Sequence, residues 1–468
     1  MIAAGNNPNP PNRRWLLLAC LIAAVPHAVF CVWYPHTPLS PDEQEYLSLG
    51  AGLAENGRLQ LSTGDVALRM PLYPLLIAGV HEWQKSNLWQ NAVQLLQTFI
   101  AWCSTIIIAL TAERLAGGRA GLLAAIIAAL YSPFLYLQMS FLTETLLIFF
   151  LSLAILIYLV AGIHARLPAI RNATLLAVAG LIGLAALTRA DALLLIVPFA
   201  VDAAIRRGPA TLRIARVAML LLPVLLVAVG WGLRNQREID RFTLSTYGGL
   251  NFYLGHNSGY AANPGLDHAD YQIFRRMRTD GGLTESQADQ LLFRQGLTFI
   301  ADHPGQTVID TISKLFVWLR TTVSLSAPTI LPLGFGVLAM SGWLRDRRSP
   351  LTGRKRSLYL ASFAAFWPAL LYWLLLLWET NQVWTSPLYV VPIGLFALFL
   401  LRSTPAVRGL LFGLFGTQLL VALVFIPIER LRWTVDGILI VAISVGLSRL
   451  CQWLSSPDTA ERAGQTPP

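Results

Sequence analysis

The sequence predicts an all-α polytopic membrane protein with about 12 transmembrane helices, and three observations lead to that fold class. Apolar runs of about 20 residues, the length that crosses the hydrocarbon core, recur along the 468-residue chain. Only 13% of the residues are charged, roughly half the share found in soluble domains, and the mean hydropathy is +0.56. The third observation is an uneven distribution of basic residues between alternate loops.

The first expected span is Trp15–Trp33, which follows Arg13 and Arg14. We interpret it as an uncleaved helix rather than a signal peptide, because it is long for a signal sequence and many apolar runs follow it. The other expected spans cover approximately residues 88–112, 121–137, 141–163, 172–188, 191–205, 217–233, 327–343, 358–378, 386–401, 409–428 and 433–453.

The basic residues determine the expected orientation. One set of loops, with both tails, holds 20 of the 35 Lys and Arg residues but 5 of the 25 acidic ones; the opposite face holds 15 basic and 20 acidic residues. Because basic loops remain in the cytoplasm, we expect both termini there. The net charge of +10 is therefore a topology signal and does not indicate nucleic-acid binding. The four cysteines lie in apolar runs and form no disulfide or zinc pattern.

The expected organisation has four parts. Residues 1–233 form an N-terminal transmembrane catalytic module, whose first extracytoplasmic loop, 34–87, carries interfacial helices. Residues 234–326 form a small extracytoplasmic segment, here called the cap, which is too short and too lightly apolar to be an independent domain. Within the cap, Thr284 and Gln287 predict a helix N-terminus through a capping box. Residues 327–454 supply the C-terminal transmembrane helices, and 455–468 form a tail expected to be disordered.

An acidic stretch, SPDEQEY, follows the first span at Ser40–Tyr46. One interpretation is structural: Ser40 caps a helix that runs from Pro41 to about Glu55, and Glu43 completes a capping box. Acidic residues in a first turn are also favoured by the helix dipole. On this interpretation the stretch only begins a surface helix.

Asp42 has a second interpretation. At helical spacing Asp42, Glu45 and Tyr46 share a face, while Glu43 is rotated away by about 100°. Asp42 is thus expected at a helix start beside the bilayer boundary. A carboxylate there can act as a general base towards a molecule that arrives from the aqueous side.

Two more polar residues are expected near this position. LRMPLYPLL, at Leu68–Leu76, predicts a second interfacial helix. Arg69 at its start either anchors the chain at the interface or binds a lipid phosphate, since a guanidinium matches phosphate geometry. Glu144 lies at the mouth of the fourth span, where an acid is costly and usually functional.

Taken in order, these motifs resemble those of a known family. PDE follows the first span, RMPLYPLL precedes the second, and FLTETLL opens the fourth. The series continues with LTRADALLLIVP, GWGLRNQREIDRFTLST, GLNFYLGHNSGY, FIADHPGQTVIDTISKL and, before the last helix, ERLRW. The chain resembles the bacterial membrane glycosyltransferases of the GT-C class, in the protein O-mannosyltransferase-like and aminoarabinose-transferase-like group.

The resemblance implies sugar transfer from a polyprenyl-phosphate-linked donor to an acceptor on the extracytoplasmic side. The family's first-loop acid, its proposed catalytic residue, falls on Asp42, and its second-loop acid falls on Glu144. The basic residue before its Pro-Pro-Leu-Tyr motif falls on Arg69, and Tyr73 is the tyrosine of that motif. Departures from the family's pattern occur at Met70, Ala190 and His256.

The chemistry of such a transfer assigns roles to these residues. The departing phosphate needs positive charge where negative charge grows, and four arginines at extracytoplasmic span ends either bind it or anchor the chain: Arg69, Arg189, Arg234 and Arg430. Asp42 is the expected base, in one displacement that inverts the anomeric centre. Glu144 would orient the acceptor, bind the sugar, or hold a divalent cation (Mg or Mn) together with Asp42.

The cap offers Asn251, Tyr253 and His256 to cover the acceptor, although a lone histidine in a polar loop is more often structural. The acceptor class stays open between lipid, protein and polysaccharide, and the expected location is the bacterial inner membrane. A transporter or flippase of lipid-linked sugars is the alternative function. Such proteins usually place ionisable residues within spans and often have repeated halves, whereas here the acids cluster in loops on one face. A non-enzymatic scaffold would need neither the acids nor the arginines.

Overall fold

The computed structural model describes residues 13–33, 38–160, 167–259, 268–320, 405–427 and 429–455, and the regular structure in these ranges is helical. The expected spans 327–343, 358–378 and 386–401 lie outside the described residues, as does the tail beyond Ser455. Among the described helices, five are long and apolar enough to cross a membrane, or six if one bent pair counts as a single span. The fold class is confirmed, while the expected number of 12 spans is not established.

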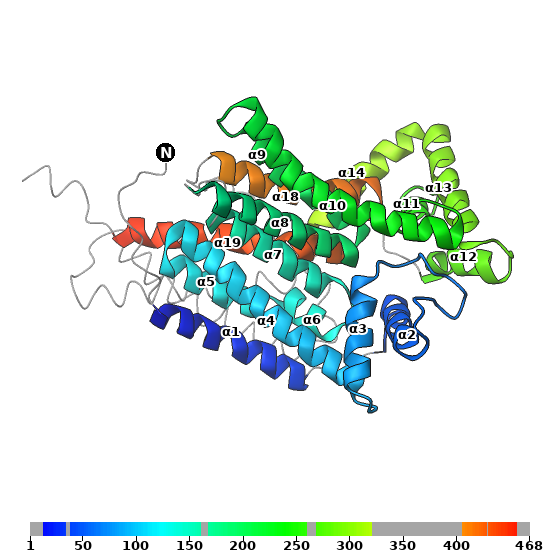
Figure 1. The fold of residues 1–468 in the computed structure, drawn as a ribbon, viewed down its shortest axis with the longest axis horizontal. Coiled ribbons are helices and arrows are strands. Elements are labelled where there is room, and N and C mark those ends of the chain that lie inside the picture. The colour runs from blue at the N-terminus through cyan, green and yellow to red at the C-terminus, as the bar shows by residue number, and fades with distance from the viewer. Residues whose placement is uncertain are drawn as a thin grey trace, which may run out of the picture.

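Most of the apolar helices lie side by side along the long axis of the molecule (Figure 1). The last of them, α19, is largely buried and contacts α4, α5, α7 and α18. The bundle consists of α1 (Arg13–Trp33), α4 (Trp89–Ala116), α5 (Gly118–Ala129), α6 (Ser132–Met139), α7 (Glu144–Val160), α8 (Pro168–Thr188), α9 (Ile196–Ile205), α10 (Ala210–Ile239), α18 (Pro405–Val424) and α19 (Glu429–Ser455).

Two expected spans are interrupted. The run 121–137 forms α5 and α6, which are bent by 52° relative to each other. The break falls just before Pro133, which has no N–H to continue a helical ladder. The run 191–205 begins as a 3₁₀ helix, η1 (Ala190–Leu195), and becomes α-helical in α9. Hydropathy locates these segments correctly but does not reveal the breaks.

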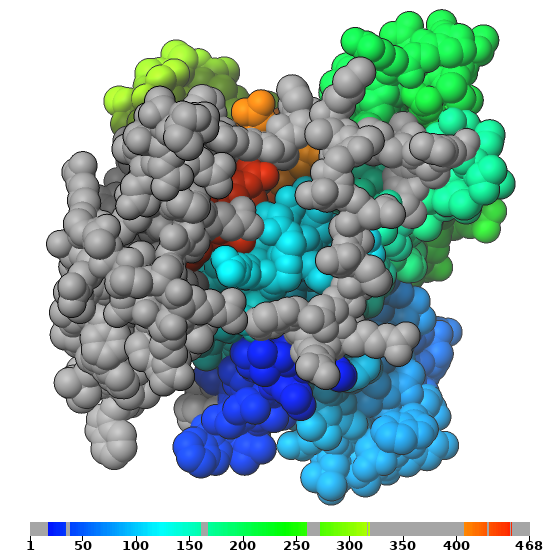
Figure 2. All heavy atoms as spheres, turned by 90° about the vertical axis from the view of Figure 1, so that its left-hand side faces the viewer, coloured from blue at the N-terminus to red at the C-terminus, as the bar shows by residue number. Residues whose placement is uncertain are grey.

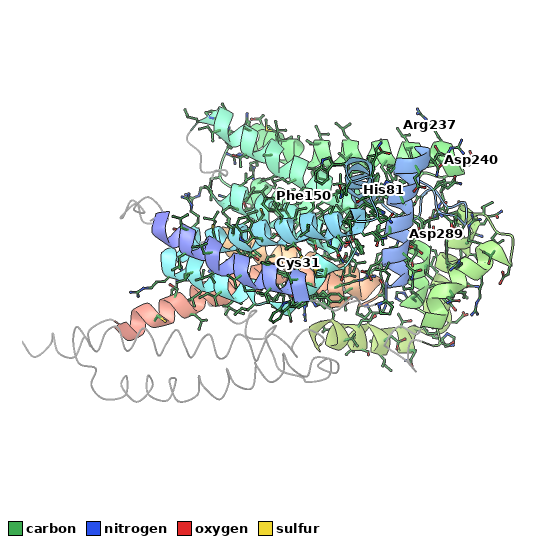
Figure 3. The ribbon with its side chains drawn as sticks, turned by 90° about the horizontal axis from the view of Figure 1, so that it is seen from below. Cys31, His81, Phe150, Arg237, Asp240 and Asp289 are labelled. Atoms are coloured by element: carbon green, nitrogen blue, oxygen red, sulfur yellow. The ribbon has the colours of Figure 1, made fainter. Side chains whose placement is uncertain are left out.

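The helices of the first loop and of the cap gather at one end of the bundle, here called the polar end (Figure 1). They are α2 (Pro41–Asn56), α3 (Leu72–Trp83), α11 (Gly248–Leu254), α12 (His268–Thr279), α13 (Glu285–Asp302) and α14 (Pro304–Arg320). His81 of α3, Asp289 of α13 and the end of α10 at Asp240 all lie at this end (Figure 3). The helix α10 runs six residues into the expected cap, and it ends at Asp240 in a left-handed conformation (φ 54°).

A second, smaller core joins the cap to the first loop. Leu68 packs there with Leu250 and Leu254 of α11 and with Ala288 and Leu292 of α13. The expected capping box of α13 is present, because the Thr284 hydroxyl accepts from the Gln287 N–H and the Gln287 side chain accepts from the Thr284 N–H. The cap is therefore ordered around the segment that carries Arg69.

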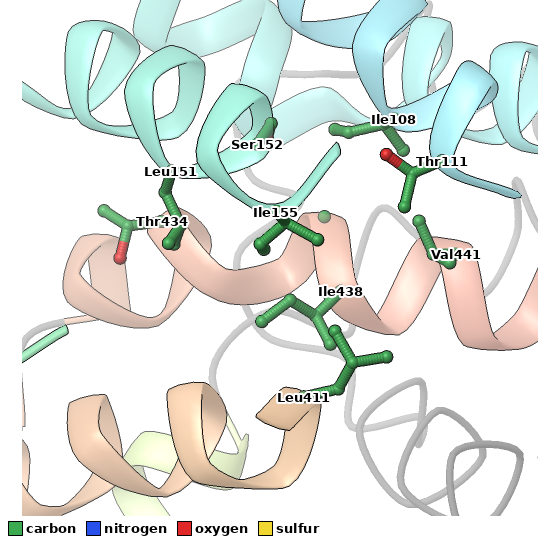
Figure 4. A pocket seen from close by; sticks show the side chains of 10 residues that line it. Ile108, Thr111, Leu151, Ser152, Ile155, Leu411, Thr434, Ile438 and Val441 are labelled. Atoms are coloured by element: carbon green, nitrogen blue, oxygen red, sulfur yellow. The ribbon is translucent and has the colours of Figure 1, made fainter. Parts of the chain in front are cut away.

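The opposite end of the molecule, shown in Figure 2, contains the ends of α5 and α19, which are in contact. Within the bundle, a small apolar cavity of about 20 Å³ lies between α4, α7, α18 and α19 (Figure 4). Its volume holds about one water molecule, and its lining is mostly aliphatic. This cavity is too small to hold a sugar.

Candidate active site

Four segments that are distant in the sequence meet at the polar end of the bundle. Asp42 lies in the first turn of α2, where the expected Ser40–Glu43 capping box and Pro41 fix the helix start. Arg69 lies in the loop before α3, Glu144 begins α7, and Arg430 lies in the first turn of α19. Glu43 is rotated away from this site, and its second oxygen accepts the Phe141 N–H (3.0 Å).

The carboxylate of Asp42 is held by two arginines. Arg69 Nη2 donates to its Oδ1 (2.5 Å), and Arg430 Nη2 donates to its Oδ2. Burial raises the pKa of the Asp42 carboxyl, but the charges of Arg430 and Arg69 outweigh burial and hold the pKa well below its usual value. Asp42 is therefore ionised at neutral pH, and its side chain is 12% exposed.

The guanidinium of Arg69 is enclosed by the face of α2 that the helical spacing predicts. Besides Asp42, it donates from Nε (2.9 Å) and Nη2 (2.6 Å) to Oε2 of Glu45. The ring of Tyr46 lies 5.0 Å from its central carbon and the ring of Tyr247 lies 4.2 Å away. Such contacts stabilise a cation and fix the plane of the guanidinium.

Glu144 forms the second acidic position. Its Oε1 accepts from Arg189 Nη1 (2.9 Å) and lies 3.6 Å from Arg430 Nε, and its side chain is 1% exposed. Arg189 also pairs with Asp191 Oδ1 (3.1 Å). Arg430 thus links Glu144 to Asp42. We call these seven residues the ionic cluster: Asp42, Glu45, Arg69, Glu144, Arg189, Asp191 and Arg430.

A cavity of about 480 Å³ lies beside the ionic cluster. Its lining combines Arg69, Arg189 and Asp191 with polar groups of the cap such as Asn251, and with apolar side chains of α18 such as Val421. A volume of this size accepts a sugar-phosphate or a similar ligand. The three arginines and four carboxylates of the ionic cluster carry one net negative charge, so the cluster has no surplus of positive charge.

Two other expected site residues, Tyr73 and Arg234, are not among the described residues that line this cavity. Tyr73 is buried behind Tyr46, against which its ring packs edge-on (5.3 Å), and its hydroxyl donates to Gln97. Arg234 donates from Nη1 to the carbonyl of Val66 (2.6 Å). In the structure, Tyr73 supports α2 and Arg234 holds the first loop.

The three candidates of the cap also differ in position. Asn251 lines the cavity. Tyr253 and His256 are not among its described lining residues. His256 is buried, with Nδ1 at 2.9 Å from the Phe252 carbonyl and Nε2 at 3.3 Å from Nζ of Lys314, itself fully buried.

Sequence reasoning missed four residues of the site. Helical spacing puts Glu45 and Tyr46 on the face of Asp42 but assigns them no role, and no pattern in the sequence singles out Asp191. Tyr247 had no signal, because nothing in the sequence pairs it with Arg69 across the loop. An aromatic residue beside two glycines is common in loops, so this pattern does not single out Tyr247.

The expected shared metal site does not fit the side chains as arranged. The guanidinium of Arg430 contacts both Asp42 and Glu144, so it occupies the space in which a divalent cation would bridge the two carboxylates. Within the described ranges, no group of three or more His, Cys, Asp or Glu side chains could hold a metal ion. We therefore derive no step through a metal.

No family model matches the sequence, and no curated protein matches it. Among solved structures, the archaeal oligosaccharyltransferase AglB from Archaeoglobus fulgidus, in complex with an inhibitory peptide and a dolichol-phosphate, has a TM-score of 0.51 at 11% identity. The match covers 97% of this chain and 53% of that one, so the chain spans about half the length of the oligosaccharyltransferase. ArnT from Cupriavidus metallidurans bound to undecaprenyl phosphate has a TM-score of 0.38 at 15% identity, over 97% of this chain and 82% of that one. The likeness to AglB shows that the chain has a GT-C-like fold, that of the polytopic membrane glycosyltransferases, as the sequence resemblance implied.

Proposed function

We propose that this chain is a glycosyltransferase that moves a sugar from a polyprenyl-phosphate-linked donor to an acceptor on the extracytoplasmic side of the bacterial inner membrane. The observation that carries the proposal is the meeting of Asp42, Arg69, Arg430 and Glu144 in one ionic cluster, of which Arg69, Arg189 and Asp191 line the cavity of about 480 Å³. The sequence resemblance supports it. The fold likeness to an oligosaccharyltransferase that binds a dolichol-phosphate is consistent with a lipid-phosphate donor.

In this proposal the donor phosphate binds in the cavity between Arg69 and Arg189, while its prenyl chain stays in the bilayer. Each of these arginines is paired with carboxylates. The phosphate must therefore displace one of those carboxylates from its arginine. Glu45 is the most exposed of the four carboxylates, at 28%. It regains hydration at the least cost, so it is the partner that gives way.

The transfer is a single displacement. The acceptor hydroxyl or amine attacks the anomeric carbon, the bond from that carbon to the phosphate oxygen breaks, and the acceptor proton passes to Asp42. The phosphate leaves as an anion towards the arginines. The negative charge of the bound phosphate offsets the arginine charges that lower the pKa of Asp42, so donor binding makes Asp42 a better base.

The orientation follows from the loop charges. The set of loops with 20 basic residues faces the cytoplasm, which places α2, α3, the cap and the ionic cluster on the outer side. Glu144 would orient the acceptor. The acceptor is a lipid, a protein or a polysaccharide that reaches the outer surface.

The test is sugar transfer in proteoliposomes that contain a panel of polyprenyl-phosphate sugars. We expect Asp42→Asn to lower the rate by about 10²–10⁴-fold, the usual effect of removing a general base. Glu55→Gln is the matched control, because Glu55 is an exposed carboxylate at the far end of the same helix; it should transfer at the wild-type rate. Undiminished transfer by Asp42→Asn would reject Asp42 as base, and retention of the anomeric configuration would reject the single displacement. Movement of intact donor between leaflets without transfer would favour a flippase.

A further inference from the structure

Two loop segments, one from the first loop and one from the cap, lie together directly beside the ionic cluster. Residues 66–68 lead into Arg69, and residues 245–247 end at Tyr247, whose ring lies over the Arg69 guanidinium at 4.2 Å. The two segments are bonded to each other, because the Thr246 N–H donates to the Ala67 carbonyl (3.0 Å) and the Ser245 hydroxyl donates to the Leu68 carbonyl (2.7 Å). Whatever holds these segments also fixes Arg69 and its stacking partner.

Glu285, the first residue of α13, binds both segments through one carboxylate. Its Oε2 accepts the Val66 N–H (2.9 Å), and its Oε1 accepts the Ala67 N–H (3.0 Å) and the Thr246 hydroxyl (2.5 Å). The side chain is buried, and a buried carboxylate is stable only when its oxygens are bonded. Three donors from two segments meet that requirement.

The position of Glu285 gives this carboxylate leverage on the site. The amides that it binds lie two and three residues before Arg69, and the carbonyl of Val66 is held as well, by Arg234 (2.6 Å). A guanidinium that must reach Asp42 and Glu45 in fixed directions tolerates a displacement of only about 0.5 Å. Movement of residues 66–67 would therefore misplace Arg69 even with its own side chain intact.

We propose that Glu285 is a positioning residue for Arg69: a carboxylate on the cap sets the guanidinium of the first loop against Asp42. Glu285 itself does not touch the substrate. The inference rests on the proposed function only for what Arg69 binds, and the placement of Arg69 can be measured without any substrate.

The first experiment measures hydrogen–deuterium exchange of the purified full chain in nanodiscs. Glu285→Gln keeps the shape of the side chain but replaces one acceptor oxygen by an NH₂ group, which cannot accept an amide N–H. We expect exchange in the peptide that contains Val66 and Ala67 to rise about tenfold or more, since a bond to a charged acceptor is lost. Thr246→Val, which removes only the hydroxyl donor, should give a smaller rise in the same peptide. Thr284→Ala is the matched control. It removes the exposed N-cap hydroxyl of the same helix, α13, without touching residues 66–67.

Unchanged exchange in Glu285→Gln, or an equal rise in Thr284→Ala, would overturn the positioning role. If Glu285→Gln does not fold, the comparison of Thr246→Val with Thr284→Ala still decides, since equal exchange in these two variants would overturn it as well.

The second experiment measures affinity for a polyprenyl phosphate in a double-mutant cycle. Glu285→Gln should weaken binding by about tenfold in the wild-type background and should add nothing in an Arg69→Ala background, because it acts through Arg69. Additive losses would show that Glu285 supports the fold generally, and would overturn the inference. If the wild type binds no polyprenyl phosphate, the proposed function fails, while the exchange result still decides the role of Glu285.

Discussion

Asp42 lies between two guanidinium groups, and this position keeps its carboxylate ionised. Because Arg69 and Arg430 each donate to one of its oxygens, the free site holds an anion that is too well stabilised to be a strong base. On the proposed function, an anionic donor would compete for the same arginines, so the strength of the base would depend on the presence of the donor.

The depressed pKa of Asp42 predicts how stability depends on pH. A carboxyl whose pKa is lower in the folded state stabilises the protein above its unfolded pKa of about 3.9, and this contribution is lost as the pH falls through the folded value. The difference in melting temperature between the wild type and Asp42→Asn should therefore be constant from pH 8 to pH 6. It should shrink only in strongly acidic solution. A difference that does not shrink in strongly acidic solution would mean that the carboxyl has no such stabilisation.

Glu45 leads to a prediction of opposite sign. Its carboxylate occupies Nε and Nη2 of Arg69, an edge that suits a phosphate equally well. Glu45→Gln removes the competing charge and should tighten the binding of polyprenyl phosphate by several-fold, as expected for an exposed ion pair of about 1 kcal/mol. Native mass spectrometry or a lipid-competition assay measures this affinity. Weaker binding in Glu45→Gln would show that Glu45 assists the donor instead of competing with it.

At the scale of elements, the site depends on how closely α2 approaches α3. Gly50 of α2 faces α3, and a Cβ there would overlap the Ile77 side chain and lie 3.3 Å from the Pro74 carbonyl. Asp42, Glu45 and Tyr46 are carried on this one short helix. Any shift of α2 therefore moves three groups of the site together.

A matched pair of glycines tests this dependence. Gly50→Ala should cost about 1–3 kcal/mol from overpacking and should lower transfer, because α2 must move away from α3. Gly79 of α3 has open space around it, so Gly79→Ala should stabilise the helix by up to about 1 kcal/mol without loss of transfer. Thermal unfolding and the transfer assay measure both effects. Ile77→Ala added to Gly50→Ala should restore activity, and equal behaviour of the two glycine variants would refute the close-approach argument.

The start of α19 is positioned by a second arginine. Arg432 is fully buried, donates to the Trp318 carbonyl of α14 (3.2 Å) and pairs with Asp436 one turn later (3.3 Å). It fixes the first turn of α19 against the last helix of the cap. Arg430, in the same turn, is thereby directed towards Asp42 and Glu144.

For the whole molecule, the charge distribution works against long-range attraction of a phosphate. The face that is expected to lie outside the cytoplasm carries more acidic than basic residues, and the ionic cluster itself has one net negative charge. Binding of an anion there must depend on short, directional contacts with partly buried arginines. Such contacts are screened less by salt than exposed charges are.

The sequence predicts the parts of this structure that depend on local signals. Ser40, Pro41 and Glu43 define the start of α2, and helical spacing places Asp42, Glu45 and Tyr46 on one face, as found. Contacts between distant segments have no such signal: Arg430 reaches Asp42 across 388 positions, and Glu285 reaches Val66 across 219. The expectation of a shared metal site was based on two acidic residues alone. It did not include the arginine, Arg430, that lies between them. Pairing of this kind follows from the packing of α19 and the cap, which hydropathy does not specify.

If the ionic cluster recognises the phosphate of a lipid, the purified protein should bind polyprenyl phosphate and the uncharged polyprenol with different affinities. We predict that the wild type binds the phosphate at least tenfold more tightly and that Arg69→Gln with Arg189→Gln abolishes the difference, since each lost charge-assisted contact is worth about 1.5–3 kcal/mol. Equal affinity of the wild type for the two lipids would show that the protein does not recognise the phosphate. A preference that survives in the double variant would show that the ionic cluster is not where the phosphate binds.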